Sequence, residues 1–423
     1  MRVEILTIGD ELLLGFTIDS NAAYLARALG EVGIEVVRHD TVGDEGPAIA
    51  EAVRGALDRT GGVVTTGGLG PTSDDLTRPS IAALFGRTLR RDDVIVAELE
   101  RRFRALGYGT MPRSNLVQAM VPEGARVLEN RHGSAPGLWL EDERGRWVAM
   151  LPGVPREMRG MTRDVLLPLL RERSASGPPV VVLSRTLRTT GIGESALAEK
   201  LGDDGLAANG LRVAYLPGWE GVDLRLTVRG AHRDDADAAL AGGIERLRLR
   251  AGRYVYGEEG DDLAAVVLDL CRRSGMHVAT AESCTGGLLG GRLTSIEGSS
   301  DVYLGGVVAY ANAVKVSLLG VSEATLTSKG AVSEEVASEM ASGARTRLDA
   351  LIGIGITGIA GPGGGTPEKP VGTVWIAVDI EGRVQTHGRI YVGDRDEIRR
   401  RATQSALDMV RRALSRDDAL STR

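Results

Sequence analysis

The stretch GGVVTTGGLGPTSDDLT, residues 61–77, predicts a buried strand that runs into a glycine-rich turn and then into a helix. Upstream of it, strand-like runs alternate with helical patterns at residues 3–9, 19–33, 34–43 and 45–61. Short apolar strands separated by helices of this length are typical of a parallel sheet with helices on both faces. We therefore expect residues 1–172 to form a doubly wound α/β domain, in which ligands bind beyond the carboxyl ends of the strands.

Two further domains are predicted from the remaining sequence. The segment RERSASGPP, residues 171–179, is rich in Ser, Gly, Pro and charged residues, which is typical of a linker. Alternating patterns then predict a small α+β module over residues 173–256. Residues 257–418 begin with a helix and a strand and continue through further apolar runs, so we expect a second α/β domain there.

Composition places the chain among ordinary globular proteins. Of the 423 residues, 43% are hydrophobic and 26% are charged, and the net charge is −6. The acidic balance argues against duplex nucleic acid as a direct partner, because phosphate contacts dominate that affinity. The sequence has neither a signal-peptide pattern nor an apolar run long enough to cross a membrane, and its two cysteines lack zinc-ligand spacing. We expect a cytoplasmic protein that contacts no membrane.

The glycine turn after the third strand is the first candidate site. Gly67, Gly68 and Gly70 carry no Cβ, so their N–H groups can approach an anion such as phosphate. Asp74 and Asp75 follow directly, and two carboxylates beside phosphate oxygens require a divalent cation between them. The alternative is a tight turn in which one of the aspartates caps the next helix.

Four more side chains are predicted to join this phosphate and metal site. Thr66 and Thr72 flank the glycines and offer hydroxyl donors to phosphate. Glu11, a further metal ligand, follows the first strand, whose carboxyl end neighbours that of the third strand in a doubly wound sheet. Asn21 lies in the first turn of the next helix and is expected to face the same crevice. The alternative for the turn after the first strand is a helix cap without a functional role.

A serine at a strand–turn–helix corner is the second candidate site. In ATAESCTGGLLGGRL, residues 279–293, Ser283 follows an apolar strand and precedes a helix, where a nucleophile is held exposed. A serine hydroxyl needs a base, and Lys315 in AYANAVKVSLLGV is the candidate, because Ser–Lys pairs are a known variant of the catalytic triad. Burial lowers a lysine pKa enough for this role. Tyr310 precedes the lysine by five residues and is expected to hold it or to donate to substrate.

Three alternatives compete with this Ser–Lys interpretation. Ser283 and Thr285 cap a helix while Gly286 and Gly287 admit a phosphate, which gives binding without catalysis. Lys315 is an ordinary surface lysine. Cys284 is the nucleophile instead of the serine, although free cysteines are usually buried and inert.

A second glycine-rich loop is predicted to complete the substrate site. GITGIAGPGGG, residues 355–365, follows another apolar strand, and Thr357, Gly358 and Gly361 within it are expected to face a phosphate or an oxyanion. The stretch GDRDEIRR supplies Arg395 and Arg399, either of which can clamp a phosphate or a carboxylate.

As a set, these motifs are similar to those of the CinA family of competence/damage-inducible proteins. They are IGDELLLGFTIDSNAAYLA, TTGGLGPTSDDLT, NRHGSAPG, LPGVPREM, TAESCTGG, YANAVK and GITGIAGPGG, and they span nearly the whole chain. The resemblance implies a molybdopterin-binding-like N-terminal domain, a small middle module and a C-terminal amidohydrolase domain. It also implies two activities that serve pyridine-nucleotide recycling: deamidation of nicotinamide mononucleotide to nicotinate mononucleotide in the C-terminal domain, and metal-dependent cleavage of ADP-ribose in the N-terminal domain.

The same resemblance implies roles for individual residues. Ser283 is the nucleophile and Lys315 its base, with Tyr310 nearby, and this amidase site needs no cofactor. Asp74 and Asp75 belong to the N-terminal site, which takes Co²⁺, Mg²⁺ or Mn²⁺. A homodimer is expected. Two other functions stay open: a nucleotide- or molybdopterin-binding protein without catalysis, and an accessory protein of DNA uptake or repair.

Overall fold

The computed structural model describes residues 1–105, 107, 109–174, 181–202, 206, 210–230 and 232–421, with side chains up to residue 415. The chain forms two compact units, one of Met1–Leu183 with Val228–Ala238 and one of Ser184–Thr227 with Ala239–Arg423. The predicted linker falls partly outside the described residues, at 175–179, and its first part belongs to a helix that ends at Ser174. Within the described ranges, no helix is long and apolar enough to cross a membrane.

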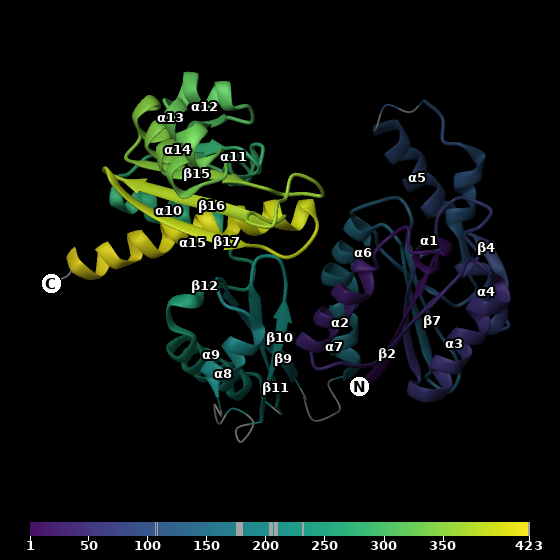
Figure 1. Cartoon of the computed structure of the whole chain (residues 1–423). Coiled ribbons are helices and arrows are strands. Elements are labelled where there is room, and N and C mark those ends of the chain that lie inside the picture. The colour runs from purple at the N-terminus through teal and green to yellow at the C-terminus, as the bar shows by residue number, and fades with distance from the viewer. Residues whose placement is uncertain are drawn as a thin grey trace. The chain divides into compact units, whose positions relative to one another are not determined.

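The first unit is built on a six-stranded sheet with the order β2-β1-β3-β8-β7-β6 (Figure 1). Its strands are β1 (Arg2–Ile8), β2 (Glu35–Val42), β3 (Gly62–Thr66), β6 (Arg126–Leu128), β7 (Gly137–Glu141) and β8 (Trp147–Leu151). The first, second, third and eighth strands run parallel, while β7 and β6 are antiparallel at one edge. All five residues of β3 are buried, as expected of a parallel strand covered on both faces.

Helices cover both faces of this sheet (Figure 1). They are α1 (Asp10–Leu13), α2 (Ser20–Glu31), α3 (Gly46–Thr60), α4 (Thr77–Leu84), α5 (Asp93–Ala105), α6 (Pro155–Met161) and α7 (Leu167–Ser174), and a short β4 (Leu89–Arg91) pairs with β5 (Met120–Pro122). Leu25 of α2 and Met158 of α6 pack in one core, and Ile49 of α3 and Ile81 of α4 pack in the other. Two cores on opposite faces confirm the predicted doubly wound α/β class for this part of the chain.

A four-stranded sheet with the order β10-β11-β9-β12 follows in the chain. Its elements are β9 (Val181–Thr189), α8 (Glu194–Leu201), β10 (Leu211–Pro217), β11 (Val222–Gly230), α9 (Arg233–Ala251) and β12 (Val255–Glu258). Alternate residues of β11 are buried, so one face of the sheet packs against helices while the other stays more exposed. This is the small α+β module expected from the sequence.

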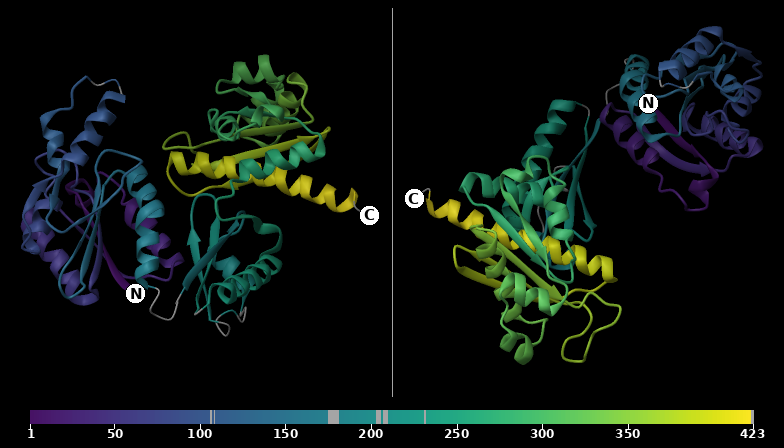
Figure 2. Two further views of the ribbon diagram at one scale, coloured as in Figure 1. Left: turned by 180° about the vertical axis from the view of Figure 1, so that it is seen from behind. Right: turned by 90° about the horizontal axis from the view of Figure 1, so that it is seen from above.

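The C-terminal part of the second unit contains a five-stranded sheet with the order β14-β13-β15-β16-β17. Its elements are α10 (Leu263–Ser274), β13 (Val278–Glu282), α11 (Leu288–Thr294), β14 (Tyr303–Val308), α12 (Asn312–Leu319), α13 (Glu323–Lys329), α14 (Glu334–Arg347), β15 (Ile352–Gly358), β16 (Thr373–Ile380), β17 (Arg383–Ile390) and α15 (Arg395–Ser421). Strands β14, β13 and β15 are parallel, and β16 and β17 are antiparallel. Figure 2 shows α12, α13 and α14 on one side of this sheet and α15 on the other.

Glycines let helix α14 approach strand β15 very closely. A Cβ at Gly353 would lie 2.0 Å from the carbonyl oxygen of Ala341, and one at Gly355 would lie 2.3 Å from that of Ala337. No side chain fits there, so these glycines are set by packing. The contact fixes β15, whose carboxyl end carries Thr357 and Gly358 beside the candidate active site.

Candidate active sites

A buried serine and a buried lysine meet at the carboxyl ends of the parallel strands in the C-terminal sheet. Ser283 directly follows β13, and its N–H donates to the carbonyl of Ile356 on β15 at 2.9 Å, which anchors the turn. Lys315 lies on α12 and is 1% exposed. Its Nζ lies 3.0 Å from the Ser283 Oγ. The two predicted catalytic residues are therefore in direct contact, and Lys315 is no surface lysine.

The surroundings of Lys315 suit both of its protonation states. Its Nζ also donates to the carbonyl of Ala309 at 2.8 Å and to that of Tyr310 at 3.3 Å. An ammonium group has three donors and meets three partners here, whereas a neutral amine keeps two donors for the carbonyls and turns its lone pair to the serine hydroxyl. Burial lowers the pKa of Lys315, which favours the neutral form.

Glu282, which the sequence reasoning missed, organises the turn after β13. Its side chain is 2% exposed and accepts hydrogen bonds from the N–H groups of Gly287 at 3.1 Å, Leu289 at 3.0 Å and Gly290 at 2.8 Å. The carboxylate therefore occupies the positive N-terminal end of α11. A strand residue whose carboxylate turns back onto the next helix gives a cap signal that is easily overlooked in a catalytic motif.

The same contacts correct part of the predicted substrate site. The N–H of Gly286 donates to the Ser283 carbonyl at 3.1 Å, and that of Gly287 is held by Glu282, so neither is available to a phosphate. Thr285 is fully buried, and Arg399 donates to its carbonyl at 2.8 Å. These four residues support the turn from behind, and none of them lines the cavity in front of Ser283.

A cavity of about 260 Å³, here called the Ser283 cavity, opens in front of the Ser–Lys pair. Besides that pair, its wall includes Tyr310, Asn312, Thr357, Gly358, Gly361 and Arg395. Arg395 donates to the Gly361 carbonyl at 2.6 Å and approaches the Tyr310 hydroxyl at 3.4 Å, so of the two predicted arginines this one faces the cavity. Asn312, in the first turn of α12, was not predicted.

Tyr310, Thr357 and Cys284 have more limited roles than the sequence left open. The Tyr310 side chain is 64% exposed at the rim, and it is its carbonyl that contacts Lys315. Thr357 is 1% exposed and donates to the Ala331 carbonyl at 2.7 Å. Burial raises the pKa of the Cys284 thiol to about 12, so it stays protonated and is a poor nucleophile beside Ser283.

A second cavity, of about 390 Å³ and here called the glycine-turn cavity, lies at the carboxyl ends of the strands in the first unit. Gly67, Gly68 and Gly70 line it together with Glu11, Asp44 and Asp74. Asp75 also borders the cavity, but its carboxylate accepts from the N–H of Gly70 at 2.7 Å and from that of Thr72 at 2.8 Å. The Thr72 hydroxyl donates to it as well. Asp75 therefore closes the turn and is not a free metal ligand, but it does not cap the next helix, because α4 begins without a side-chain cap.

Packing against neighbouring groups explains why two positions of the turn are glycines. A Cβ at Gly67, whose φ is 111°, would lie 2.1 Å from the Ile8 carbonyl oxygen, and the Gly67 N–H already donates to Leu151. A Cβ at Gly68 would lie 2.1 Å from the Thr77 hydroxyl. Thr66 and Asn21 do not line this cavity.

Thr66 and Asn21 instead form a buried polar contact behind the turn. The Thr66 hydroxyl donates to the Pro152 carbonyl at 2.9 Å and accepts from the Asn21 amide at 3.1 Å. That amide also donates to the Gly153 carbonyl at 2.7 Å. Both side chains border a neighbouring cavity of about 310 Å³. They connect α2 and β3 to the turn after β8, which is a structural role.

Carboxylates gather at the mouth of the glycine-turn cavity. Burial raises the pKa of Asp44, and the charges of Asp10, Glu11 and Asp74 add to this shift. Within the described ranges, no three acidic, histidine or cysteine side chains converge closely enough to cage a metal ion. Such a site fits a cation of the Mg²⁺ type, which is commonly held by one or two carboxylates and completed by substrate phosphates and water.

The fold and the buried Ser–Lys pair define a multidomain α/β protein with a molybdopterin-binding-like first domain. Three family models match in succession: "Probable molybdopterin binding domain" over residues 4–172, "Damage-inducible protein CinA KH domain" over 184–257 and "CinA C-terminal domain" over 260–414. The chain is 58% identical to the CinA-like protein of Gemmatimonas aurantiaca, with 99% of both chains covered. Identity is 46% to the CinA-like protein of Frankia casuarinae, with 98% and 96% covered, and 44% to that of Salinibacter ruber, with 98% and 100% covered. The chain belongs to the CinA family.

Proposed function

We propose that the C-terminal domain is an amidohydrolase that converts nicotinamide mononucleotide to nicotinate mononucleotide and ammonia. The observation that carries this proposal is the 3.0 Å contact between Lys315 Nζ and Ser283 Oγ in a buried position. A Ser–Lys pair is a recurrent device for acyl transfer, and burial of the lysine favours its neutral form. The small volume of the Ser283 cavity suits a mononucleotide better than a larger ligand.

The proposed reaction uses two successive acyl transfers. Neutral Lys315 takes the hydroxyl proton of Ser283 as Oγ attacks the carboxamide carbon. Backbone N–H groups of the glycine loop, at residues 360, 361, 363 and 364, stabilise the oxyanion. The tetrahedral intermediate collapses to an ester as the C–N bond breaks, and the lysine proton goes to the leaving nitrogen as ammonia. Water, deprotonated by the same amine, then attacks the ester and releases the carboxylate product and the serine hydroxyl.

Arg395 binds the substrate phosphate in this proposal. Its guanidinium is held by the Gly361 carbonyl and lies beside the Tyr310 hydroxyl. A guanidinium oriented in this way is suited to a phosphate at the mouth of the cavity. The nicotinamide ring then lies deeper, with its amide towards Ser283.

Ammonia release from nicotinamide mononucleotide tests the amidase proposal. The full chain should release ammonia, and Ser283→Ala should not. Ser328→Ala is the matched control, because Ser328 is an exposed serine on α13 whose hydroxyl contacts carbonyls of its own helix. If the wild-type chain releases no ammonia while binding the nucleotide, the protein is a nucleotide-binding module instead.

We propose as a second activity that the first unit cleaves the pyrophosphate of ADP-ribose with the help of a divalent cation. One or two of the carboxylates of Glu11, Asp44 and Asp74 would hold that cation together with the substrate phosphates, whose charge it would neutralise. The raised pKa of Asp44 among other carboxylates supports this, because crowded acidic groups favour a bound cation.

The role of the substrate in completing the cation site is open to a direct test. Mn²⁺ alone should leave the unfolding midpoint of the first unit unchanged, while Mn²⁺ with ADP-ribose should raise it and give cleavage products. Stabilisation by Mn²⁺ alone would indicate a resident metal site. Salt-sensitive affinity for DNA, with no turnover of either nucleotide, would favour the accessory role in DNA uptake or repair.

A further inference from the structure

A third cavity, of about 240 Å³, lies within the second unit where the α+β module meets the C-terminal helix. It is distinct from the Ser283 cavity and shares no residue with it. One wall is formed by residues 190–194 before and at the start of α8 and by the 217–222 hairpin, and the other by Arg389, Tyr391 and one side of α15. We call it the glycine–arginine cavity, and none of the activities proposed above uses it.

Two arginines in this cavity have no carboxylate partner. Across the described part of the chain, neither Arg389 nor Arg401 lies within ion-pair distance of an acidic side chain, although Arg400 beside them pairs with Asp396 at 2.7 Å. The Arg401 Nε is buried and meets no acceptor. A buried guanidinium nitrogen without an acceptor is costly, which points to an anionic ligand as its missing partner.

Further hydrogen-bond donors border the glycine–arginine cavity. Helix α8 begins at Glu194, and its N-cap residue Gly193 has no side chain, so the first N–H groups of the helix are not satisfied by a side-chain cap. A Cβ at Gly193 would meet no atom within 4 Å, which shows that the backbone there borders open space. Tyr391 is 7% exposed, and its hydroxyl makes no well-formed hydrogen bond to the protein and has Ser405 beside it.

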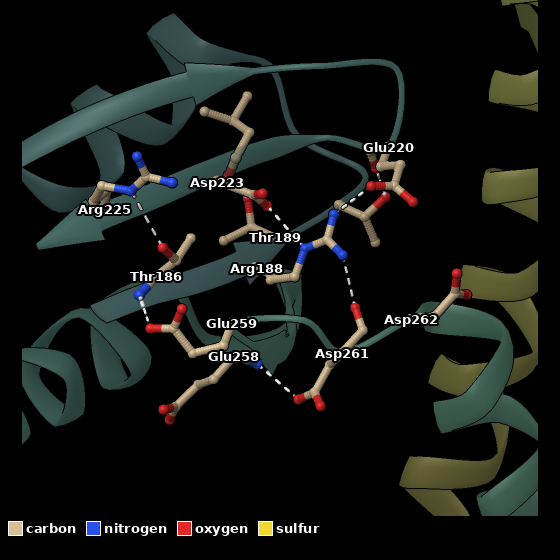
Figure 3. A network of polar contacts seen from close by, with 12 residues as sticks. Thr186, Arg188, Thr189, Glu220, Asp223, Arg225, Glu258, Glu259, Asp261 and Asp262 are labelled. Atoms are coloured by element: carbon tan, nitrogen blue, oxygen red, sulfur yellow. Dashed lines mark hydrogen bonds and ion pairs between the residues drawn. The ribbon is translucent and has the colours of Figure 1, made fainter. Parts of the chain in front are cut away.

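One of the two acidic side chains in the cavity wall is already neutralised. Glu220 borders the cavity, but it is paired with Arg188 and with Arg292 at 3.2 Å. Figure 3 shows Arg188 reaching Glu220, Asp223 and the carbonyl of Asp261, so the glutamate belongs to a polar network that already offsets its charge. The remaining acidic residue of the wall is Glu194, an exposed residue in the first turn of α8.

We propose that the glycine–arginine cavity binds the phosphate group of a small phosphorylated compound, such as a sugar phosphate. Two guanidinium groups, a helix N-terminus and a buried hydroxyl are all donors, a combination that matches a phosphate and no cation. The cavity is close in volume to the Ser283 cavity, so it accommodates a small phosphomonoester, up to the size of a mononucleotide, and excludes a dinucleotide. The ligand is therefore a phosphomonoester or free phosphate.

Calorimetric titration of the full chain with inorganic phosphate and with ribose 5-phosphate tests this site. Arg401→Ala should weaken the binding that the wild type shows at least about tenfold, as expected when a charge-assisted contact is lost. Arg383→Ala removes an exposed arginine at the start of β17, the strand that also carries Arg389, and this control should bind like the wild type. Stronger binding of ribose 5-phosphate than of phosphate would identify a sugar phosphate as the ligand, and equal binding would identify free phosphate.

Gly193→Asp gives an independent test that does not depend on a weakened fold. The position has φ −81° and open space around it, and aspartate is a preferred N-cap, so the variant should be at least as stable as the wild type. Its carboxylate should nevertheless repel the ligand and abolish binding. The proposal is overturned if Arg401→Ala and Gly193→Asp both bind phosphate as the wild type does, or if only a single-stranded oligonucleotide binds at this cavity.

Discussion

Replacing Lys315 with methionine should change how the stability of the C-terminal domain depends on pH. The side chain is 1% exposed, and burial lowers the pKa of its ammonium group. In the unfolded chain that pKa returns to about 10.4. Between the folded and unfolded values the unfolded state binds more protons, so the free energy of unfolding of the wild type rises with pH. Below the folded value both states are protonated, and the cost of the buried charge is fully present.

The size of the effect follows from the contacts of the lysine. One proton gives a slope of at most about 1.4 kcal/mol per pH unit across that window. Lys315→Met has no titrating group, so the slope disappears. At low pH the variant avoids a buried charge but leaves the carbonyls of Ala309 and Tyr310 without a donor, at about 1 kcal/mol each. Its advantage over the wild type should therefore shrink as pH rises and reverse above the folded pKa.

Pulse proteolysis in urea, from about pH 6 to about pH 10, measures the unfolding free energy across this window. Lys200→Met is the control, because it removes an exposed lysine of α8 and should keep the wild-type slope. Deamidation by the wild type should rise with pH over the same window, since the neutral amine is the base. Parallel stability curves for the wild type and Lys315→Met would refute the view that the lysine titrates within the fold.

Four further predictions concern single substitutions. Lys315→Arg keeps a cation that cannot accept a proton, so ammonia release should fall as far as in Lys315→Ala. Ser283→Ala should abolish deamidation and leave ADP-ribose cleavage unchanged, whereas Cys284→Ala should keep deamidation, because the buried thiol with its pKa of about 12 is unreactive. Glu282→Gln replaces one of the two carboxylate oxygens that accept from three N–H groups, so the C-terminal domain should lose about 1–3 kcal/mol of stability in urea titrations. For deamidation by the same variant, kcat should fall by a larger factor than KM changes. Asp74→Asn should lower ADP-ribose cleavage at least about tenfold at an unchanged unfolding midpoint, while Asp75→Asn should weaken the turn itself by about 1–3 kcal/mol; the reverse pattern would return the metal role to Asp75.

Local sequence patterns are sufficient to predict features that depend on elements consecutive in the chain. Ser283 was identified because a strand, a turn and a helix follow one another in the sequence, and the fold class followed from the strand–helix alternation. The lysine was found by its chemistry, since a serine nucleophile needs a base. Its burial and its two carbonyl partners depend on how α12 packs against α14, which no spacing rule contains.

The sequence predicts the wrong role for residues whose hydrogen-bond partners lie far along the chain or within their own turn. Asp75 looked like a metal ligand because the sequence does not show that its carboxylate turns back onto Gly70 and Thr72. The sequence predicts phosphate contacts for Thr66 and Asn21, but their carbonyl partners lie at residues 152 and 153, far along the chain. Glu282 was passed over because its role depends on helix α11 starting in line with its side chain.

The Ser283 cavity and the glycine-turn cavity both lie at the carboxyl ends of parallel strands, which leaves the turns at the opposite ends of these strands open to engineering. At the amino ends of these strands, the chain turns from α3 into β3 at Gly61 and from α14 into β15 near Asp349. Surface turns remote from a site are where chains best tolerate inserted segments. A peptide tag or a fluorescent reporter introduced after Asp349 should therefore leave the Ser283–Lys315 pair in place, and such a fusion offers a way to follow this protein in living cells while it stays active.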